Sequence, residues 1–505
     1  MSSTNFSLAN PLAVLLDKKP EDFRRMDCLD VIKKKNIERI TFHYTALDGR
    51  LKELKLPVSD LAQAERVLAQ GERVDGSSLF KGIVEPGLSD LYVVPEYKTA
   101  FLNPFDEKSL DFICRYLNKD GQRAPFAPDN ILQRAYQLFQ RNSGLTFHSM
   151  GELEFFLVFD EEKTLFPMEE QRGYHESSPF LKGGPILNEM GKYLAQITGA
   201  VKYAHSEVGS IETLESELDE INEKRAEQME IEFLPRPATE MADFLVLARW
   251  LVRNVAYRHG CLATFAPKIK NSAAGNGLHV HLELKKDGEN VMLEKDQKLS
   301  EQALRLIGGL CAYGDSLTAF GNTVASSYFR LVPEQEAPTQ IYWSDLDRNA
   351  LIRVPLAWSG IKNIAKVINP GDESEARIPP AGQTVEFRCP DGSAWPHFLL
   401  AGIIMSADWS MKNDESLDIV QKHYSVKGKM GNDEKLESFP SLPKSCSESS
   451  QILSRKRKMF EKEGVFPSSV IDYVVDNLKK EEVIMVDHDR TRNLQKLMHK
   501  DLHKH

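Results

Sequence analysis

Charged side chains occur in pairs, two residues apart, inside otherwise apolar segments of this chain. Glu152 and Glu154 stand in Gly-Glu-Leu-Glu-Phe-Phe-Leu-Val, and Glu386 precedes Arg388 in Val-Glu-Phe-Arg-Cys. Because side chains of a strand alternate between its faces, residues i and i+2 project from the same side of a sheet. The pairs therefore predict a sheet with one charged face. The same spacing recurs in three further pairs: His279 and His281, Glu230 and Glu232, and His205 and Glu207.

This charged face favours a metal site. Two carboxylates on one apolar strand repel each other, and a bound cation offsets the repulsion. Carboxylates joined by an imidazole suit Mg²⁺ or Mn²⁺, which are hard cations that prefer oxygen ligands. For Glu152 and Glu154 taken alone, a solvated sheet face is the alternative. For His279 and His281 taken alone, the alternative is a structural pair.

Four arginines lie in the same half of the chain as several of these acids. Arginine clamps a carboxylate or phosphate through two parallel hydrogen bonds, and a divalent metal with arginine is recurring equipment of phosphoryl transfer. Taken singly, each arginine could instead form a surface ion pair. No Gly-x-x-x-x-Gly-Lys-Ser/Thr motif is present, so a nucleotide site here would not be a P-loop. The four are Arg330, Arg348, Arg353 and Arg388.

Composition restricts the partners and the compartment. Among 505 residues, 64 Lys and Arg stand against 74 Asp and Glu, and the net charge of -10 offers nucleic acid or anionic lipid no global attraction. The longest strongly apolar run, Phe398 to Met405, is too short to cross a bilayer. Six cysteines without a Cys-x-x-Cys pair suit reduced thiols, and Met1 to Leu16 lacks a secretory pattern. We expect a cytoplasmic protein with no nucleic-acid or membrane partner.

Turn signals divide the chain into two parts. Residues 1–38 are expected to form a helical lead-in, and alternation from Ile40 to Leu54 about Asp48-Gly49 predicts a β-hairpin within a small N-terminal sheet. The polar stretch Asn118 to Asp129 contains Gly and Pro and is typical of a linker. Asp129 is expected to cap the next helix, after which strands and helices are interleaved.

Three polar segments are expected to lie at the surface. Glu212–Glu227 is dense in acidic residues, and Asp414–Ser450 is polar with Gly, Ser and Pro. We expect both to be mobile loops rather than core. The end of the chain, His499 to His505, is expected to be a frayed tail rather than a metal site.

Six motifs resemble those of the glutamine synthetase family, and the resemblance extends from about Arg39 to near Tyr473. Any one motif is weak evidence, but six in the family's order and with compatible spacing are specific. They are Val-Asp-Gly-Ser-Ser at 74–78, Gly-Glu-Leu-Glu-Phe-Phe at 151–156, His-Ser-Glu-Val at 205–208, Gly-Asn-Gly-Leu-His-Val-His at 275–281, Arg-Leu-Val-Pro-Glu-Gln-Glu-Ala-Pro at 330–338 and Val-Glu-Phe-Arg-Cys-Pro-Asp at 385–391.

The resemblance implies an α+β fold and an activity. After the lead-in of residues 1–38, it implies a small N-terminal β-grasp domain over 39–122 and a larger C-terminal catalytic domain over 123–505, with a curved antiparallel sheet and helices. It implies ligation of ammonia to glutamate through γ-glutamyl phosphate, with ATP consumed and glutamine, ADP and phosphate released. It also implies a homo-oligomeric ring, a hexamer or dodecamer, with active sites between subunits.

Site residues carry over from the matching motifs. Two or more Mg²⁺ or Mn²⁺ ions are implied, one held by Glu154, Glu207 and Glu230, the other by Glu152, His279 and Glu386. Arg330, Arg388 and the backbone of Gly275 resemble the glutamate-binding groups, while Arg348 and Arg353 resemble the arginines that bind phosphate and the transition state. Glu336 resembles the flap residue that closes the site, and Asp75 of the adjacent subunit resembles the carboxylate that holds ammonium and removes a proton.

Four residues depart from the family pattern at positions that touch substrates. Ala274 stands where glutamine synthetases usually carry Asn, and Trp395 where they carry another Asn. Glu283 and Thr384 stand where Ser and Arg often assist the nucleotide. The departures keep two alternatives open. One is a γ-glutamylamine ligase that uses a primary amine or polyamine instead of ammonia, and the other is a catalytically inactive structural ring.

Overall fold

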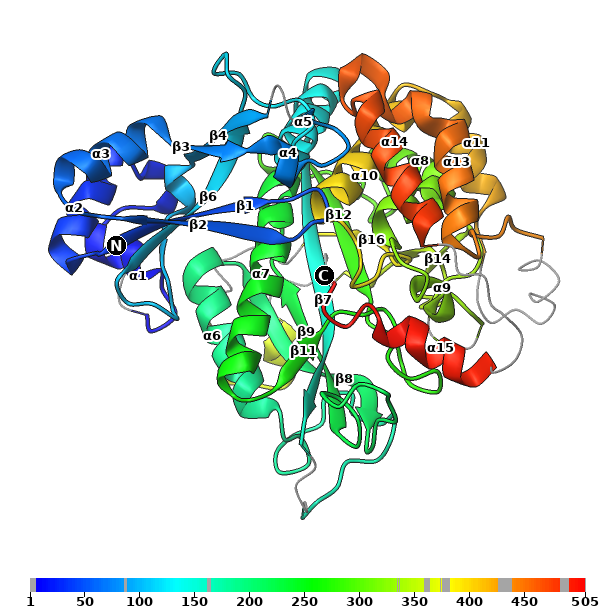
Figure 1. The fold of residues 1–505 in the computed structure, drawn as a ribbon. Helices are drawn as coiled ribbons and strands as arrows, with labels where there is room; N and C mark the ends of the chain where they lie inside the picture. The colour runs from blue at the N-terminus through cyan, green and yellow to red at the C-terminus, as the bar shows by residue number, and fades with distance from the viewer. Residues whose placement is uncertain are drawn as a thin grey trace.

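The computed structural model describes residues 6–85, 89–160, 165–333, 335, 337–357, 364–372, 374, 382–425, 438–481 and 490–504. Figure 1 shows an N-terminal sheet and its helices in blue beside a larger unit coloured cyan to red. Strands and helices occur together in both units, which confirms the α+β class. The domain boundaries inferred from sequence stay predictions.

The N-terminal unit is a sheet in the order β2-β1-β6-β4-β3, with β5 paired to β6. The predicted hairpin is present, because β1 and β2 pair antiparallel from Arg39↔Pro57 to Thr45↔Leu51. The elements are α1 (Pro11–Leu16), η1 (Pro20–Asp22), α2 (Arg25–Lys35), β1 (Arg39–Thr45), β2 (Leu51–Pro57), α3 (Leu61–Gln70), β3 (Glu72–Asp75), α4 (Gly76–Leu79), β4 (Asp90–Pro95), η3 (Tyr97–Thr99), β5 (Phe101–Leu102) and β6 (Ser109–Leu117).

The catalytic unit is built on a mixed sheet in the order β14-β15-β16-β12-β7-β9-β8. All pairs along this path are antiparallel except β14 with β15. The strands are β7 (Thr146–Phe159), β8 (Val201–Ile211), β9 (Arg225–Phe233), β10 (Arg236–Pro237), β11 (Leu262–Thr264), β12 (Leu278–Lys286), β13 (Glu289–Asn290), β14 (Trp343–Asp345), β15 (Ile352–Val354) and β16 (Val385–Phe387).

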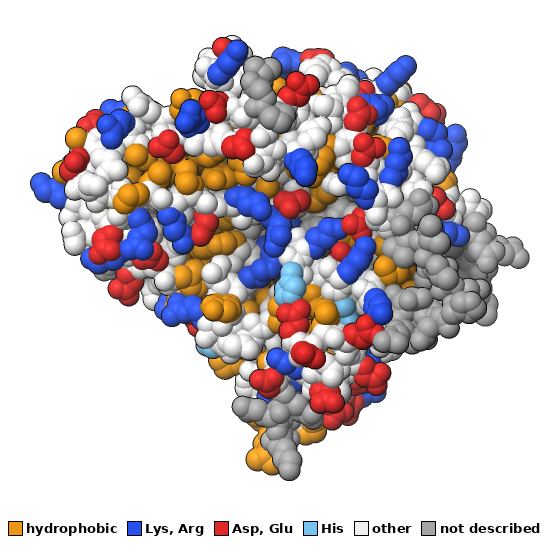
Figure 2. Space-filling model, viewed as in Figure 1, with side chains coloured by type: hydrophobic (Ala, Val, Ile, Leu, Met, Phe, Trp, Pro, Cys, Tyr) orange, Lys and Arg blue, Asp and Glu red, His pale blue; other side chains and the backbone are white. Residues whose placement is uncertain are grey.

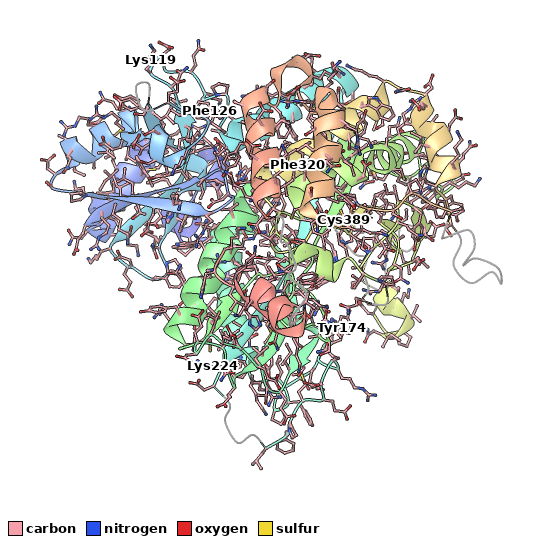
Figure 3. All side chains as sticks on the ribbon, turned by 45° about the vertical axis from the view of Figure 1, so that its right-hand side comes forward. Lys119, Phe126, Tyr174, Lys224, Phe320 and Cys389 are labelled. Carbon is pink, nitrogen blue, oxygen red and sulfur yellow. The ribbon has the colours of Figure 1, made fainter. Side chains whose placement is uncertain are left out.

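Helices cover this sheet and supply most of its apolar packing. Phe320 of α8 illustrates the core: it is fully buried against Phe398, Phe460 and Phe466. Figure 3 shows Phe320 among the helices of the catalytic unit and Lys119 at the outer tip of the molecule. The helices are α5 (Pro128–Ser143), α6 (Gly184–Thr198), α7 (Ala238–Arg258), α8 (Glu301–Gly321), α9 (Ser327–Arg330), η4 (Ile364–Val367), α10 (Pro396–Met411), α11 (Glu415–Lys422), α13 (Cys446–Phe460), η5 (Lys462–Gly464), α14 (Ser468–Lys480) and α15 (Arg490–His499).

The helix after the linker starts differently from the prediction. Ala127 occupies the N-cap of α5 and Pro128 its first turn, where proline lacks only an N–H that would have no helical partner. Asp129 lies inside the first turn, and its carboxylate makes no capping hydrogen bond. The prediction that Asp129 caps α5 is therefore wrong, and its side chain is buried instead.

Both predicted mobile loops contain core residues. Within Glu212–Glu227, Leu214 and Ile221 are buried in a hydrophobic cluster, and Glu227 lies in β9 with its carboxylate bonded to backbone amides. The apolar residues among the acids explain the difference, because burying them stabilises the fold. In Asp414–Ser450, α11 and the start of α13 are helical, and residues 426–437 lie outside the described part.

The end of the chain is packed rather than frayed. His499 is 4% exposed, and its ring contacts Ile269 O through Nε2 and Ser216 Oγ through Nδ1, both at 2.9 Å. Leu502 is 1% exposed and packs in the same cluster as Ile269 and Ala273. Leu502, the one apolar residue among the histidines and lysines of 499–505, accounts for this packing.

Candidate active site

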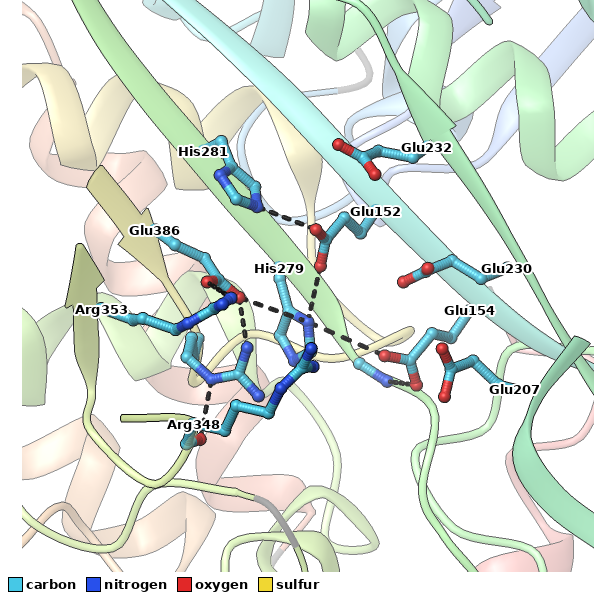
Figure 4. Close-up of polar contacts among 12 residues, drawn as sticks. Glu152, Glu154, Glu207, Glu230, Glu232, His279, His281, Arg348, Arg353 and Glu386 are labelled. Atoms are coloured by element: carbon cyan, nitrogen blue, oxygen red, sulfur yellow. Dashed lines mark hydrogen bonds and ion pairs between the residues drawn. The ribbon is translucent and has the colours of Figure 1, made fainter. Parts of the chain in front are cut away.

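Four neighbouring strands bring the charged pairs together. On β7 and β12, Glu152 lies opposite His279, while on β7 and β9, Glu154 lies opposite Glu230. Strand β16 places Glu386 opposite His281 of β12. Figure 4 shows these side chains converging from neighbouring strands. The predicted charged sheet face is thus present, and antiparallel register positions its members.

The Glu152 carboxylate is hydrogen-bonded to two histidines. The carboxylate accepts from His279 Nδ1 at 2.9 Å and from His281 Nε2 at 2.8 Å. His279 Nε2 in turn lies 3.1 Å from Arg330 Nη2, which donates to it. Burial and then Arg388 lower the pKa of His279 to about 4, so its imidazole is neutral near pH 7. A neutral imidazole fixed by a carboxylate is a competent metal ligand.

Three other carboxylates of the site have raised pKa values. Burial raises the pKa of Glu154 to about 6, and burial together with the nearby Glu154 raises the pKa of Glu207 to about 7. Burial and the surrounding carboxylates raise the pKa of Glu230 well above its usual value. Concentrated negative charge in a buried place favours either protons or a bound cation.

The geometry fits divalent cations. Groups of three side chains offer ligand atoms within 4.8 Å of one another, and one group, Glu152 with His279 and Glu386, coincides with a predicted ligand set. The other predicted set is divided, since Glu154 and Glu230 group with His279, whereas Glu207 and Glu230 group with His205. Hard oxygen donors with one imidazole per group suit Mg²⁺ or Mn²⁺.

Arginines lie beside the carboxylates in the same cavity. Arg353 Nη1 lies 2.8 Å from Glu386, which also pairs with Arg388. Arg388 Nε donates to Arg348 O at 2.9 Å, and Arg330 Nη1 donates to Cys389 O at 3.0 Å. Arg330 and Arg388 are both almost fully buried. The backbone contacts hold these guanidinium groups in fixed positions, which suits the recognition of anionic substrates.

A glycine permits the close approach of the acidic and basic groups. A Cβ at Gly277 would lie 2.8 Å from Arg330 Nη2 and 2.9 Å from Glu154 Oε1. The Gly277 N–H donates to Glu154 Oε2 at 2.7 Å. A side chain at this position would therefore displace a candidate metal ligand and a candidate substrate-binding arginine together.

These groups line one cavity of about 550 Å³. Its volume is typical of a small-molecule site. Asp75 and Glu336 are the two predicted site residues missing from its lining: Asp75 lies at the end of β3, and Glu336 lies outside the described residues. The predicted residues that line the cavity are Glu152, Glu154, Glu207, Glu230, Gly275, His279, Arg330, Arg348, Arg353, Glu386 and Arg388.

Asp75 is exposed and held by its neighbours. Its carboxylate accepts from Ser77 N at 2.9 Å, Ser77 Oγ at 2.7 Å and Ser78 Oγ at 2.6 Å. Hydrogen bonds from Ser78 and Ser77 lower the pKa of Asp75 to about 2. The group is therefore ionised at neutral pH.

An aromatic cluster on one wall of the cavity was not predicted. Tyr174 packs edge-on against His205, with ring centroids 5.6 Å apart, and Tyr203 lies 5.5 Å from the same imidazole. Figure 3 labels Tyr174 on the catalytic unit. Tyr174 lies in a segment without regular structure, so no periodicity marks it in the sequence. The His205–Glu207 and Glu230–Glu232 spacings were the available signals for this wall.

The four departures from the family pattern have different surroundings. Ala274 lines the cavity, and its N–H donates to Gln171 Oε1 at 2.8 Å. Trp395 packs instead against Phe398, Tyr473 and the hairpin at Gly49, away from the cavity lining. Glu283 and Thr384 are also absent from that lining. Glu283 accepts from Asn290 Nδ2 at 2.7 Å, and the Thr384 hydroxyl lies 3.0 Å from His281 Nδ1.

Comparison with known proteins identifies the class. The chain is an ATP-dependent carbon–nitrogen ligase by family, because residues 126–495 match the glutamine synthetase catalytic domain and residues 36–119 match the glutamine synthetase β-grasp domain. It belongs to the glutamine synthetase family, which confirms the resemblance and the two-domain α+β architecture inferred from its motifs.

Relatives match most of the chain at moderate identity. Glutamine synthetase of Pyrococcus abyssi is 31% identical over 365 residues, 72% of each chain. Glutamine synthetase of Aquifex aeolicus is 28% identical over 485 residues, covering 90% of this chain and 94% of the relative.

Solved structures share the fold. A cryo-EM structure of Plasmodium falciparum glutamine synthetase has a TM-score of 0.72 at 21% identity, covering 91% of this chain and 96% of that one. A structure of GmaS without ligand has a TM-score of 0.67 at 19% identity, covering 90% and 97%. Among the described residues, no helix has the length and hydrophobicity that a bilayer crossing requires.

Proposed function

We propose that this protein joins an amine to the γ-carboxylate of glutamate through γ-glutamyl phosphate at the expense of ATP, with ammonia as the favoured amine and glutamine as the product. The observation that carries the proposal is one cavity in which six carboxylates and His279 lie with four arginines, of which Arg330 and Arg388 are buried, Arg353 is half-buried and Arg348 is exposed. Such a site can neutralise a triphosphate, a carboxylate and a transferring phosphoryl group at once.

The arginines perform the anion chemistry in this proposal. Arg330 and Arg388, with the backbone of Gly275, bind the glutamate carboxylate. Arg348 and Arg353 neutralise the charge that develops on the transferring phosphoryl oxygens. Glu336 acts on the flap that excludes water from the acyl phosphate, which water would otherwise hydrolyse.

The carboxylates hold two or more divalent ions. Glu152, His279 and Glu386 form one ligand set, and Glu154, Glu207 and Glu230 supply the other. When bound, Mg²⁺ or Mn²⁺ would screen the phosphate charges and orient the nucleotide. In this structure His279 Nδ1 donates to Glu152 and Nε2 accepts from Arg330, so a metal ion bound through Nε2 would require Arg330 to release the ring.

Asp75 acts in a neighbouring subunit of a homo-oligomeric ring, a hexamer or dodecamer. Its exposure, its ionised state and its absence from the cavity of its own chain support this role. A carboxylate with a pKa of about 2 attracts ammonium well but takes up a proton poorly. We therefore assign Asp75 mainly to holding ammonium. The N-terminal unit also exposes Met26, Leu61 and Tyr92, and Figure 2 shows hydrophobic side chains gathered over that unit.

A γ-glutamylamine ligase is the second candidate, and Ala274 with the aromatic wall favours it. Ala274 lines the cavity with a methyl group where an amide side chain is usual, and Tyr174 and Tyr203 line it with aromatic rings, a type of side chain that can contact an alkyl ammonium. Lys202 Nζ already lies 4.8 Å from the centroid of the Tyr203 ring. Trp395 gives this candidate no support, because it packs away from the cavity. A structural ring without turnover is the third candidate. The intact set of carboxylates and arginines favours an enzyme over it.

The test is glutamate-dependent phosphate release from ATP with Mg²⁺ or Mn²⁺, comparing ammonium with a panel of primary amines and polyamines. Product mass identifies the amide. Glutamine formed with ammonium alone supports the proposal, and a γ-glutamylamide with little glutamine establishes the second candidate. No turnover with any amine, despite ATP and metal binding, establishes the third. Glu386→Gln should be inactive, and the exposed Glu107→Gln is its matched control.

We place the protein in the cytoplasm, and its thiols support this assignment. All six cysteines are free, and five of them are buried. Burial and reduction are consistent with a cytoplasmic enzyme. Fractionation of cells that express the tagged protein tests this assignment.

A further inference from the structure

The tail of the chain lies against the acidic segment Glu212–Glu227, and the proposed function uses neither of them. Figure 1 shows the end of the chain, in red, running from α15 back toward β7. Within the described tail residues, 499–504, His499, Asp501 and Leu502 are buried. Three polar contacts join the tail and the helix before it to the acidic segment: His499 with Ser216 at 2.9 Å, His503 with Glu220 at 2.7 Å and Lys496 with Glu217 at 3.1 Å.

The tail and the acidic segment pack against a loop of the active-site cavity. Leu502 lies in one hydrophobic cluster with residues of the acidic segment and of the loop 265–277 between β11 and β12: Leu214, Ile221, Ile269 and Ala273. His499 Nε2 also lies 2.9 Å from Ile269 O. Residues 272–275 of the same loop line the cavity. The tail therefore packs on the loop that carries Gly275.

Hydrogen bonds continue from the tail to two groups of the site. Thr264 Oγ1 donates to Leu502 O at 2.9 Å, and Thr264 O accepts from Asn276 Nδ2 at 3.3 Å. Gln228 Nε2 donates to Asn276 Oδ1 at 3.2 Å. The same nitrogen has two further acceptors, each at 3.0 Å: Gly275 O and Glu154 Oε2. A continuous set of hydrogen bonds thus joins the tail to a glutamate-binding backbone and to a candidate metal ligand.

A separate contact links the tail to a substrate-binding arginine. Ser326 Oγ donates to Asp501 Oδ2 at 3.1 Å, and both residues are buried. Ser326 is the N-cap of α9, which ends at Arg330. A Cβ at Gly275 would lie 3.1 Å from Arg330 Cγ, so the loop and α9 are adjacent in the site. The tail contacts the loop and the N-cap of α9 at the same time, although the two elements are far apart in the sequence.

We propose that the tail is a positioning element for glutamate, because it holds the loop of Gly275 and helix α9 in the arrangement that binds this substrate. The inference rests on the proposed function, which supplies glutamate as the ligand. Binding groups that are held in place beforehand lose less conformational freedom when the ligand arrives. Loss of the tail's contacts should therefore weaken glutamate binding, and it should affect ATP, which is assigned to Arg348 and Arg353, much less.

The experiment compares two full-length variants that each lose a buried leucine side chain. Leu502→Ala removes the apolar contact between the tail and the loop. Leu478→Ala removes a similarly buried leucine of α14 that belongs to a different cluster, and it is the matched control for lost stability. Calorimetry measures glutamate binding in the presence of Mg²⁺ and a non-hydrolysable ATP analogue, at a temperature at which both variants are folded.

Leu502→Ala should raise the Kd of glutamate about 10-fold and leave the Kd of the ATP analogue within about 2-fold, whereas Leu478→Ala should change neither. An unchanged glutamate Kd in Leu502→Ala, or an equal rise in both variants, would overturn the proposal. If Leu502→Ala does not fold, Thr264→Val takes its place. It keeps the side-chain size, removes the hydroxyl that bonds Leu502 O and should raise the Kd of glutamate in the same way.

Hydrogen exchange of residues 265–277 without ligand gives a readout that does not depend on glutamate. Exchange should be faster in Leu502→Ala than in the unaltered protein and unchanged in Leu478→Ala. If the unaltered protein binds no glutamate, the proposed function fails. The exchange rates then still decide whether the tail holds the loop: faster exchange in Leu502→Ala alone supports this part of the inference, and equal rates overturn it.

Discussion

Lowering the pH from about 8 to about 5.5 should weaken Mn²⁺ binding to the active site about 100-fold, because protons compete for the carboxylates. Glu207 has a pKa of about 7 and Glu154 a pKa of about 6. Both are mainly ionised at the higher pH. At the lower pH the metal must displace a proton from each, which costs roughly 30-fold in affinity at Glu207 and roughly 4-fold at Glu154. The product corresponds to about 2.8 kcal/mol.

The direction of this effect follows from the sign of the shifts. Both pKa values are raised, so protonation sets in as the pH falls through about 7 and then about 6. His279 adds little to the competition, since its pKa of about 4 lies below the range studied. Glu230, whose pKa is also raised, can only increase the dependence.

Isothermal titration calorimetry with Mn²⁺ in buffers of different ionisation enthalpy measures both the affinity and the protons released. Between one and two protons should leave per ion bound at the lower pH. Glu207→Gln removes the larger contribution and should reduce the pH dependence to roughly 4-fold, whereas Glu107→Gln should leave it unchanged. If the Mn²⁺ affinity of the unaltered protein varies less than about 5-fold between these two pH values, the reasoning is refuted.

Three substitutions test other parts of the structure. Glu386→Gln should reduce kcat at least about 100-fold and weaken metal binding, because it removes a charge paired with Arg353 and Arg388; kinetics close to normal would remove Glu386 from the site. Asp75→Asn should raise the KM for ammonium about 10-fold or more with Mn²⁺ affinity unchanged, and a parallel loss of metal affinity would contradict its role. Leu502→Ala should lower stability by about 2–5 kcal/mol in denaturant unfolding, and a loss below about 1 kcal/mol would show that the tail packs loosely.

The charged face of the sheet could be predicted because side chains alternate between the two faces along every strand. Alternation fixes the side on which Glu152 and Glu154 lie, whatever the neighbours are. Which of the candidate ligands would share one metal ion could not be predicted in the same way. Register decides that Glu230 lies opposite Glu154 and near His205, and register is a tertiary property. Spacing along one strand therefore predicts which side chains share the charged face, but it does not predict which of them group around one ion.

Three other predictions failed because they rested on residue type or motif position, which do not show whether a side chain is buried. Asp129 has a residue type favoured at helix caps, but Pro128 already occupies the first turn, and tertiary packing buries the carboxylate. The tail His499 to His505 looked polar because histidines and lysines dominate it, yet its Leu502 is buried. Trp395 was assigned to the substrate site by position in a motif, whereas its ring packs on the hairpin at Gly49.

The packed tail has a consequence for biosynthesis. Leu502 fills a cluster whose other members, such as Phe156 and Ile269, are made hundreds of residues earlier. Thr264 Oγ1 donates to Leu502 O at 2.9 Å, and Ser326 Oγ donates to Asp501 at 3.1 Å. On the ribosome, this part of the catalytic unit remains open until residue 502 has emerged. The nascent chain exposes this apolar surface in the meantime, so its folding should depend on protection from aggregation until the cluster closes.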